Sequence, residues 1–232
     1  MTSPAFADIF ARNQGSLTDA QQQLLQTKRV AVIGCGGLGG YVIEALVRVG
    51  VGRLHLFDPD VFAPSNCNRQ LNALLSTLGQ NKAEAAARRA AGIHPFVTVQ
   101  AFAADFRAVA EEEPLRVDVA VDCLDNIQAR RDLAALCNHR SMPLVHGAVN
   151  GWYGQVGVQL AGGDLIDRLY PERMASGLPP PVLASTVALI ASLQAAETVK
   201  LLLGLASPLH NTWMHIDLKD CDFLVNEPQP TK

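Results

Sequence analysis

The sequence predicts an α/β fold: a mostly parallel, twisted sheet with helices on both faces and a partly antiparallel C-terminal half. Three observations predict it. Short apolar runs rich in β-branched residues alternate with helical patterns through the first 140 residues. A glycine-rich turn follows the first apolar run, as it does where a buried parallel strand leads into a helix. After residue 143 the pattern changes to strand, turn and strand.

The predicted elements of the first half have clear boundaries. Thr18 is a suitable N-cap for a helix that ends an N-terminal arm, residues 1–27. The next helix closes at Gly50, and a helix rich in Ala, Glu and Arg stops at Gly92. The predicted strands are "RVAVIG", "GRLHLFD", "FVTVQAF" and "VDVAVDCLDN", and the predicted helices are "GLGGYVIEALVRVG", "LGQNKAEAAARRAAGIHP" and "IQARRDLAALCNHRS".

The second half combines strands, a long connection and a long helix. The stretch "PLVHGAVNGWYGQVGVQLAG" is predicted as strand, turn and strand, and "TWMHIDLKDCDFLVNE" as a closing strand pair. Residues 162–181 are predicted as a loop, which leads into the helix "VLASTVALIASLQAAETVKLLLG". Long loops in compact domains are commonly lids or binding segments. Because no internal repeat stands out, residues 1–232 are predicted to form one domain.

The composition limits the classes of protein that this chain can be. Hydrophobic residues make up 49% and charged residues 18% of the 232 residues, which predicts a sizeable buried core. The formal net charge of −3 argues against a nucleic-acid binder, which carries a basic face. The chain opens without a basic-then-apolar leader, and its most apolar stretch is interrupted by polar residues. The five scattered cysteines fit a reducing compartment, so we expect a cytoplasmic protein without membrane spans.

The glycine turn predicts a nucleotide site. Gly34, Gly36 and Gly39 satisfy the pattern G-x-G-x-x-G between a predicted strand and a predicted helix. Such glycines let the backbone approach a phosphate at the N-terminus of the helix. Asp58 ends the next strand, where a carboxylate can accept hydrogen bonds from ribose hydroxyls. The pattern indicates a Rossmann-like nucleotide-binding domain, and a glycine turn without a ligand is the alternative.

Cations that follow the second strand favour ATP over NAD. Arg69 lies in "SNCNRQ", and Lys82 opens the next predicted helix. A triphosphate carries more charge than a dinucleotide pyrophosphate and usually recruits Lys, Arg and magnesium. An arginine can bind two phosphate oxygens at once in a fixed geometry. The alternative is a polar loop with cations on the protein surface.

Acidic residues gather at the end of another strand. The stretch "VDCLDN" puts Asp122, Asp125 and Asn126 at a carboxyl end, where open α/β sheets bind their ligands. A carboxylate there can hold magnesium on a triphosphate, or it can cap the following helix. Asp122 is interpreted as a structural acid.

Taken together, the motifs resemble the MoeB/ThiF/HesA adenylyltransferases, relatives of the ubiquitin-activating enzymes. The resemblance rests on G-x-G-G-L-G, D-x-D, S-N-x-N-R-Q, a Lys about 12 residues later, "DCLDN" and the "IASLQAAETVKLLLG" helix, so it covers nearly the whole chain. It implies an enzyme that uses ATP and magnesium to adenylate a small ubiquitin-fold or sulfur-carrier protein at its C-terminal Gly-Gly carboxylate, releasing pyrophosphate. Thiamine, molybdopterin or a related pathway would use the product.

The resemblance also implies roles for individual residues. Asp58 would hold the ribose, Asp60 would shape the pocket, and Asp125 would hold magnesium. The residues expected to act in catalysis are Arg69, Lys82, Asp125 and Arg12. The residues expected to bind ATP are Gly34, Gly36, Gly37, Leu38, Gly39, Asp58, Asp60, Asn66, Arg69, Gln70, Lys82, Asp125 and Asn126.

By the same resemblance, Arg12 in "FARNQGSL" would reach the ATP site of a second subunit, as an arginine finger does. That role implies a homodimer, and a solvated surface arginine is the alternative. The loop of residues 162–181, a crossover-type loop in this family, is a candidate path for the carrier's tail. A plain surface connection is the alternative there.

Two features common in such enzymes are missing from the sequence. The chain has no pair of C-x-x-C motifs, so no structural zinc is predicted. No cysteine lies between Gly147 and Thr186, so activation is expected to end at the acyl-adenylate, which a separate sulfur donor or amine would accept. Cys67 and Cys221 are expected to be buried.

Other functions remain open on the sequence alone. The same chemistry could act on a small acid, a peptide C-terminus or a modified tRNA base. A non-catalytic nucleotide-binding scaffold and an NAD-linked oxidoreductase are further alternatives. Asp58, Arg69, Lys82 and Asp125 together argue against the scaffold.

Overall fold

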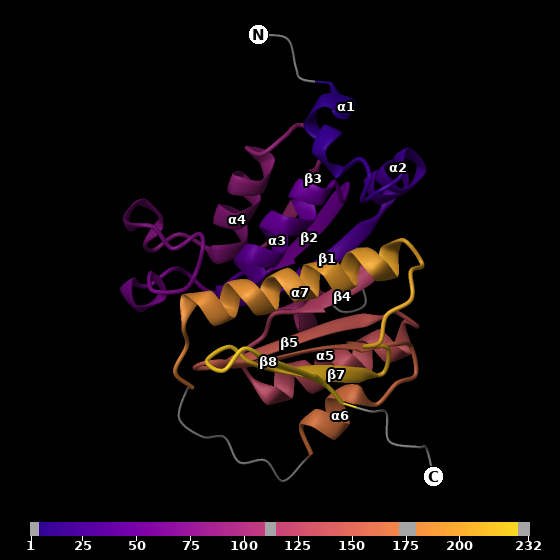
Figure 1. The fold of residues 1–232 in the computed structure, drawn as a ribbon. Coiled ribbons are helices and arrows are strands. Elements are labelled where there is room, and N and C mark those ends of the chain that lie inside the picture. The colour runs from indigo at the N-terminus through magenta and orange to yellow at the C-terminus, as the bar shows by residue number, and fades with distance from the viewer. Residues whose placement is uncertain (1–4, 110–114, 172–179, 227–232) are drawn as a thin grey trace.

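The computed structural model describes residues 5–109, 115–171 and 180–226. Within these ranges eight strands form one sheet in the order β3-β2-β1-β4-β5-β6-β7-β8 (Figure 1). The strands are β1 (Arg29–Ile33), β2 (Arg53–Phe57), β3 (Thr98–Phe102), β4 (Val119–Asp122), β5 (Leu144–Asn150), β6 (Tyr153–Gln159), β7 (Thr212–Asp217) and β8 (Asp222–Val225).

The pairing of the strands confirms the predicted fold class. Strands β3, β2, β1, β4 and β5 are parallel, whereas β6, β7 and β8 continue the sheet in antiparallel pairs. β1 and β4 are almost wholly buried, as expected for parallel strands that are covered on both faces. Because these strands are parallel, the carboxyl ends of β1, β2 and β4 lie at the same end of the sheet. The predicted site residues follow these strand ends.

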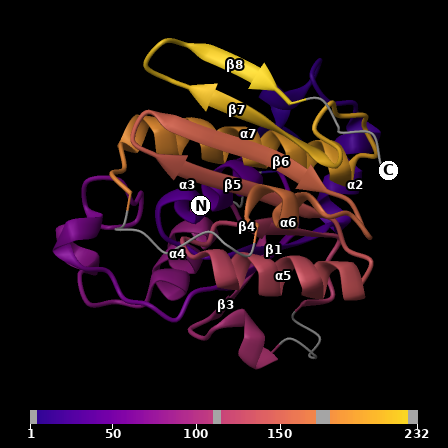
Figure 2. The same ribbon diagram turned by 90° about the horizontal axis from the view of Figure 1, so that it is seen from below.

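Helices cover both faces of the sheet (Figure 2). α3, α4 and α7 contribute to one apolar core, and α5 and α6 contribute to the core on the opposite face. The helices are α1 (Phe6–Ile9), α2 (Asp19–Thr27), α3 (Gly37–Val49), α4 (Lys82–Ala91), α5 (Ile127–His139), α6 (Leu165–Leu169) and α7 (Ala184–Leu202). Short 3₁₀ turns are η1 (Ala11–Asn13), η2 (Pro64–Asn66), η3 (Leu75–Thr77) and η4 (Phe106–Val109).

The N-terminal arm is attached to the far end of α3. Thr18 caps α2 in a capping box with Gln21, as predicted. α3 ends at Gly50, whose φ of 101° is left-handed. Gln22 of α2 donates a hydrogen bond from Nε2 to the carbonyl of Val49 at 2.9 Å. The arm therefore lies at the end of α3 that is remote from the glycine turn.

Three sequence-based expectations about local structure are wrong. Part of the predicted loop of residues 162–181 forms the helix α6, because its apolar residues Leu165 and Ile166 are buried against the sheet; residues 172–179 lie outside the described ranges. Cys67 is exposed, since it ends the η2 turn on the surface. Cys221 is exposed in the tight β7–β8 turn, at a positive φ of 56°. Cys137 is buried in α5.

Within the described ranges, no helix is both long enough and apolar enough to cross a membrane.

Candidate functional site

The glycine turn between β1 and α3 leaves no room for a side chain at Gly34 or at Gly39. Gly34 has a φ of +94°, and a Cβ there would lie 2.6 Å from the carbonyl oxygen of Cys123. A Cβ on Gly39 would lie 1.8 Å from the carbonyl oxygen of Gly34. Gly36 is the N-cap of α3 and offers no side chain to the first N–H groups of the helix. These groups are therefore available to an anion.

Gly37 and Leu38 are the first two residues of α3, so the predicted turn residues all lie at this helix N-terminus.

Asp58 holds the glycine turn in place. Its Oδ2 accepts a hydrogen bond from the backbone N–H of Cys35 at 2.7 Å, and its Oδ1 accepts one from Asp60 N–H at 2.9 Å. Burial raises the pKa of Asp58, while these two N–H groups oppose the rise. Each carboxylate oxygen can accept a second hydrogen bond, so the predicted bond to a ribose stays a prediction.

The segment of residues 65–70 folds back onto the start of α3. The Nε2 of Gln70 lies 3.2 Å from the position that a Cβ on Gly36 would take. Gln70 is buried, and its Oε1 has no hydrogen-bond partner in the described part of the chain. Asn66 shapes the segment, since its Oδ1 accepts from Ala63 N–H and its carbonyl accepts from Gln70 N–H. The fold-back brings the preceding residue, Arg69, toward the helix N-terminus.

Arg69 is held by its own loop. Its Nη1 donates to the carbonyl of Ser65 at 2.9 Å and to Oδ1 of Asn68 at 2.8 Å. Both partners are neutral, so no carboxylate among the described residues neutralises the guanidinium. It can exchange these weak partners for the oxygens of an anion.

Lys82 begins α4 and lies beside the acids that follow β2. Its Nζ forms an ion pair with Oδ2 of Asp60 at 2.8 Å, and its backbone N–H donates to the carbonyl of Asp60. The Lys82 side chain is 10% exposed, whereas that of Asp60 is 67% exposed. Asn81 donates from Nδ2 to the carbonyls of Asp58 and Asp60 and fixes this arrangement.

Asp125 and Asn126 have separate roles at the carboxyl end of β4. Asn126 caps α5, because its Oδ1 accepts from the N–H of Ala129 at 2.8 Å. Asp125 is exposed, and its carboxylate makes no hydrogen bond or ion pair with the described residues. The backbone of Cys123 touches Gly34, so Asp125 lies two residues from the glycine turn. The capping role that the sequence left open for Asp125 belongs to Asn126.

Magnesium fits Asp125 only together with phosphate oxygens. Among the described residues, no group of three or more His, Cys, Asp or Glu could hold a metal ion. Magnesium in nucleotide sites usually takes one or two carboxylates and completes its octahedron with phosphates and water. The single exposed carboxylate of Asp125, at the carboxyl end of β4, suits that chemistry.

Arg12 lies far from the glycine turn of its own chain. It is exposed in η1, next to Asn13, which donates hydrogen bonds to Gln22 and to the carbonyl of Val49. Those contacts put it at the C-terminal end of α3, and a helix of this length spans about 20 Å. The other predicted site residues gather at the N-terminal end of that helix.

A buried ion pair that the sequence did not predict lies behind Asp125. Oδ2 of Asp122 accepts from Nη1 of Arg130 and from Nδ1 of His146, both at 2.7 Å, and Oδ1 accepts from Leu124 N–H. Burial alone would raise the pKa of Asp122, but the charge of Arg130 and the hydrogen bond from His146 lower it. Arg130 also donates to the carbonyls of Leu124 and Gly147. Asp122 is therefore structural, as the sequence indicated.

The network continues to Tyr170. Nε2 of His146 lies 3.1 Å from the hydroxyl of Tyr170 and 3.1 Å from Nε2 of Gln155, which itself donates to that hydroxyl at 2.8 Å. Burial lowers the pKa of His146 below its ordinary value, although the hydrogen bond to Asp122 opposes the shift, so the neutral imidazole is favoured at neutral pH. With Nδ1–H donated to Asp122, the tautomer assigned from this network leaves Nε2 to accept from Tyr170.

One member of this network had a signal in the sequence. Arg130 shares the buried stripe of α5 with Leu133, Ala134 and Cys137, at helical spacing. A charged residue in an apolar stripe indicates a buried partner. Tyr170 had no comparable signal, because it lies in a stretch predicted as a loop.

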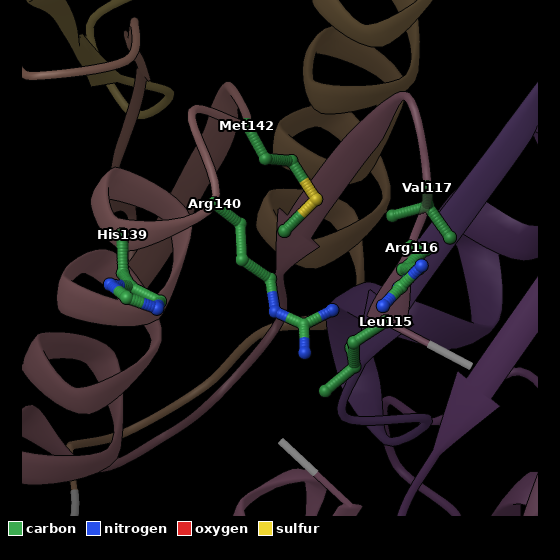
Figure 3. Close-up of a pocket in the computed structure, with 6 residues that line it drawn as sticks. All are labelled: Leu115, Arg116, Val117, His139, Arg140 and Met142. Atoms are coloured by element: carbon green, nitrogen blue, oxygen red, sulfur yellow. The ribbon is translucent and has the colours of Figure 1, made fainter. Parts of the chain in front are cut away.

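A surface cavity of about 460 Å³ lies elsewhere on the sheet (Figure 3). Its lining residues precede β4 and β5, whereas the glycine turn and Asp125 follow β1 and β4. The cavity therefore lies at the amino ends of these strands, whereas the candidate site lies at the carboxyl ends. It is lined by Leu115, Arg116, Val117, His139, Arg140 and Met142.

Comparison with known proteins decides the family. The sequence profile of the ThiF family matches residues 10–232. The chain belongs to the ThiF family.

Two relatives with named activities match this ThiF-family chain over most of their own length. The SAMP-activating enzyme E1 of Haloferax volcanii is 35% identical over 208 residues, which cover 87% of this chain and 77% of that protein. The molybdopterin-synthase adenylyltransferase of Escherichia coli is 32% identical over 212 residues, 87% of this chain and 84% of that protein.

A third relative has a different activity in its name. The tRNA threonylcarbamoyladenosine dehydratase of Bacillus subtilis is 37% identical over 145 residues, 61% of this chain and 57% of that protein. Among solved structures, E. coli MccB with ATP has a TM-score of 0.74 and 22% identity over 89% of this chain. The match covers 65% of the MccB chain, and at this identity it shows a shared fold only.

The ThiF-family chain is thus an enzyme of the MoeB/ThiF adenylyltransferase type, a class that uses ATP. The resemblance drawn from the glycine turn, the S-N-x-N-R-Q segment and the D-N pair is confirmed.

The neutral, buried His146 predicts a fold that is sensitive to acid. Because folding lowers the pKa of His146, the unfolded chain binds a proton first as the pH falls below roughly 6.5. Stability from this residue is complete above that pH and is lost below it, with a limiting slope of about 1.4 kcal/mol per pH unit. Urea unfolding between about pH 8 and about pH 5 measures the loss.

The His146→Gln variant is the comparison, because it keeps every other titrating group. Its free energy of unfolding should fall less than that of the wild type over the same pH interval. If the free energy of unfolding changed equally with pH in the two proteins, the result would contradict a neutral His146.

Proposed function

We propose that this enzyme uses ATP and magnesium to adenylate the C-terminal Gly-Gly carboxylate of a small ubiquitin-fold or sulfur-carrier protein. The observation that carries the proposal is the fold-back of residues 65–70 onto the glycine turn, with Gln70 against Gly36. It brings toward a helix N-terminus a guanidinium that has no carboxylate partner among the described residues, which suits a triphosphate better than a dinucleotide. The names of two relatives support the class of substrate.

In this reaction a carboxylate oxygen of the carrier attacks the α-phosphorus of ATP in line. The bond from the α-phosphorus to the bridging oxygen breaks, and pyrophosphate leaves with the electron pair. The products are an acyl-adenylate and pyrophosphate. The chain contributes position and neutralising charge rather than covalent chemistry.

Each cation has a proposed task in that step. Arg69 exchanges the carbonyl of Ser65 and the amide of Asn68 for two phosphate oxygens. Lys82 exchanges part of its ion pair with Asp60 for a third oxygen. The α3 N-terminus binds the same phosphates through its free N–H groups, Asn66 and Gln70 line them, and Asp58 receives the ribose.

Magnesium would be held by Asp125, with Asn126 beside it. When bound, the ion neutralises the negative charge of the phosphates and of the leaving pyrophosphate. Asp125 suits this task because it is exposed and carries no ion pair with the described residues. The buried network around Asp122 fixes the backbone that presents it.

The site is proposed to be completed by a second subunit in a homodimer. Arg12 lies at the remote end of α3, so its own glycine turn is out of reach. An arginine supplied in trans would add charge where the pyrophosphate leaves.

A protein substrate is supported by the surface near the end of the sheet. β8 is the edge strand, and its side chains are exposed, with Phe223 at 47% and Leu224 at 60%. An exposed apolar edge strand is a template for pairing with another chain. We propose that the carrier docks there and that its tail runs along the segment of residues 162–181, which includes α6, toward Asp125.

The reaction is proposed to stop at the acyl-adenylate on this enzyme. The sequence between Gly147 and Thr186 contains no cysteine, so no thiol of that stretch can take the carrier as a thioester. A separate sulfur donor or amine would accept the activated carboxylate.

A tRNA base is the second candidate substrate, because the B. subtilis relative carries that activity in its name. The net charge of −3 is unfavourable for binding a polyanion. Binding of tRNA with a steep salt dependence, together with no response to any carrier, would favour this second function.

Pyrophosphate–ATP exchange with purified Gly-Gly-ending carriers tests the proposed function. The wild type should catalyse exchange only with carrier present. Arg69→Ala and Asp125→Ala should each lower the exchange rate by about 10²-fold or more, as expected when a charge-stabilising group is lost. Arg48→Ala, which removes an exposed guanidinium on α3, should stay within about twofold. Tight binding of NAD, without pyrophosphate–ATP exchange in the presence of any carrier or small acid, would overturn the proposal.

Mixing two inactive variants tests the role of Arg12. Arg12→Ala and Lys82→Ala should each be inactive, but a hybrid dimer has one site with Lys82 and a partner Arg12 intact. Random re-association of equal amounts should restore about a quarter of wild-type exchange. If Arg12 acted within its own subunit, mixing would restore nothing.

A further inference from the structure

The helix α7 carries a buried glutamine whose side chain reaches the end of β4. α7 packs across β4, β5 and β6 (Figure 1). Gln194 is fully buried, and its Nε2 donates a hydrogen bond to the backbone carbonyl of Asp122 at 2.8 Å. The same amide interacts with the thiol of Cys123, the next residue. The helix "IASLQAAETVKLLLG" therefore has a side chain bonded to the chain that leads to Asp125.

Gly147 leaves the space that the amide of Gln194 occupies. A Cβ on Gly147 would lie 2.3 Å from Cδ of Gln194 and 2.5 Å from its Oε1. The Oε1 atom has no hydrogen-bond partner in the described part of the chain. A buried carbonyl oxygen without a partner is unfavourable, and a methionine would fill a similar volume without one. This cost favours a role for the amide in the hydrogen bond to Asp122 over a role in packing.

Gln194 and Arg130 hold the ends of β4 and β5 from opposite faces of the sheet. Arg130, on the α5 face, donates to Oδ2 of Asp122 at 2.7 Å and to the carbonyl of Gly147 at 2.8 Å. Gln194, on the α7 face, donates to the carbonyl of Asp122 and packs against Gly147. The two strand ends are therefore fixed from both sides, just before the turn that carries Asp125.

Cys123 joins these strand ends to the nucleotide site. Its N–H donates to the carbonyl of Ile33 at the end of β1, at 2.9 Å. Its carbonyl oxygen lies 2.6 Å from the position that a Cβ on Gly34 would take. The carboxylate of Asp125, two residues later, has no partner among the described residues, so its place is set by the backbone before it. Gln194 is one of the side chains that fix this backbone.

We propose that Gln194 is a positioning residue for magnesium binding. Through the carbonyl of Asp122, it keeps the Asp125 carboxylate in place beside the glycine turn, so that this carboxylate and the phosphates of ATP can share one magnesium ion. Because Gln194 is fully buried, it contacts neither the nucleotide nor the ion. The inference rests on the proposed roles of ATP and Asp125, and it does not depend on the carrier.

ATP binding with and without magnesium tests the proposal on the enzyme alone. Calorimetry in excess magnesium and in EDTA gives the factor by which magnesium raises the affinity for ATP. In Gln194→Met this factor should fall by about tenfold, because a metal ligand that loses its support binds more weakly. The affinity for ATP in EDTA should stay within about twofold of the wild type, because the glycine turn and its cations are unchanged.

Gln159→Met is the matched control, since it makes the same change at another buried glutamine. Gln159 lies on β6 opposite Leu144, at the start of β5, and therefore at the end of the strand remote from Asp125. This variant should keep the wild-type affinity for ATP both in magnesium and in EDTA.

Two further variants show how Gln194 acts. If it acts through Asp125, then Asp125→Ala removes the gain from magnesium, and Gln194→Met adds no further loss in that background. Gly147→Ala displaces the amide of Gln194 without replacing the glutamine, because the new Cβ overlaps the amide. It should lower the gain from magnesium in the same direction as Gln194→Met.

The opposite results would overturn the proposal. They are an equal gain from magnesium in the wild type and in Gln194→Met, or losses that add in the double variant with Asp125→Ala. A loss of ATP affinity in EDTA as large as the loss in magnesium would also overturn it, because a merely structural role predicts that result.

The proposed function can fail separately from this inference. If Gln194→Met loses the gain from magnesium but the wild type shows no exchange with any carrier, the positioning role stands and the proposed substrate is wrong. If the wild type binds ATP equally well with and without magnesium, the roles of Asp125 and Gln194 both fail.

Discussion

The buried ion pair between Asp122 and Arg130 is the interaction on which the site depends most. It joins β4, α5 and β5, and it carries His146 on the same carboxylate oxygen. A pair with one partner removed leaves an uncompensated buried charge, which costs about 3–5 kcal/mol. Here the turn that carries Asp125 would lose its backbone hydrogen bonds as well. Buried contacts therefore fix the position of Asp125, which is the exposed end of the site.

The outer part of the site is held by weaker contacts. Asp58 fixes the glycine turn through two backbone N–H groups, while Lys82 is paired with the exposed Asp60. Arg69 rests on neutral partners. The neutral partners of Arg69 and the exposed carboxylate of Asp60 can be exchanged for phosphate oxygens at small cost, because contacts at the protein surface contribute little to stability. A rigid interior and an exchangeable surface together suit a site that binds and releases a nucleotide in every turnover.

Most of the fold could be predicted from the sequence because its signals are local. The glycine turn, the capping box at Thr18 and the apolar runs of β1 and β4 each specify an element through neighbouring residues. What the sequence missed depends on distant partners. Tyr170 and Gln155 acquire their roles only when β5, β6 and α6 meet. α6 was missed because a five-residue helix depends on its tertiary contacts more than on propensity.

Calorimetric titration of the enzyme with ATP, AMP and NAD, in the presence of magnesium, measures whether residues 65–70 and the glycine turn form a triphosphate site. If residues 65–70 complete a triphosphate pocket, ATP should bind at least about tenfold more tightly than AMP or NAD. Arg69→Ala should remove about tenfold from the affinity for ATP and leave AMP unchanged. NAD binding as tightly as ATP, or an affinity for ATP that does not respond to Arg69→Ala, would contradict the account.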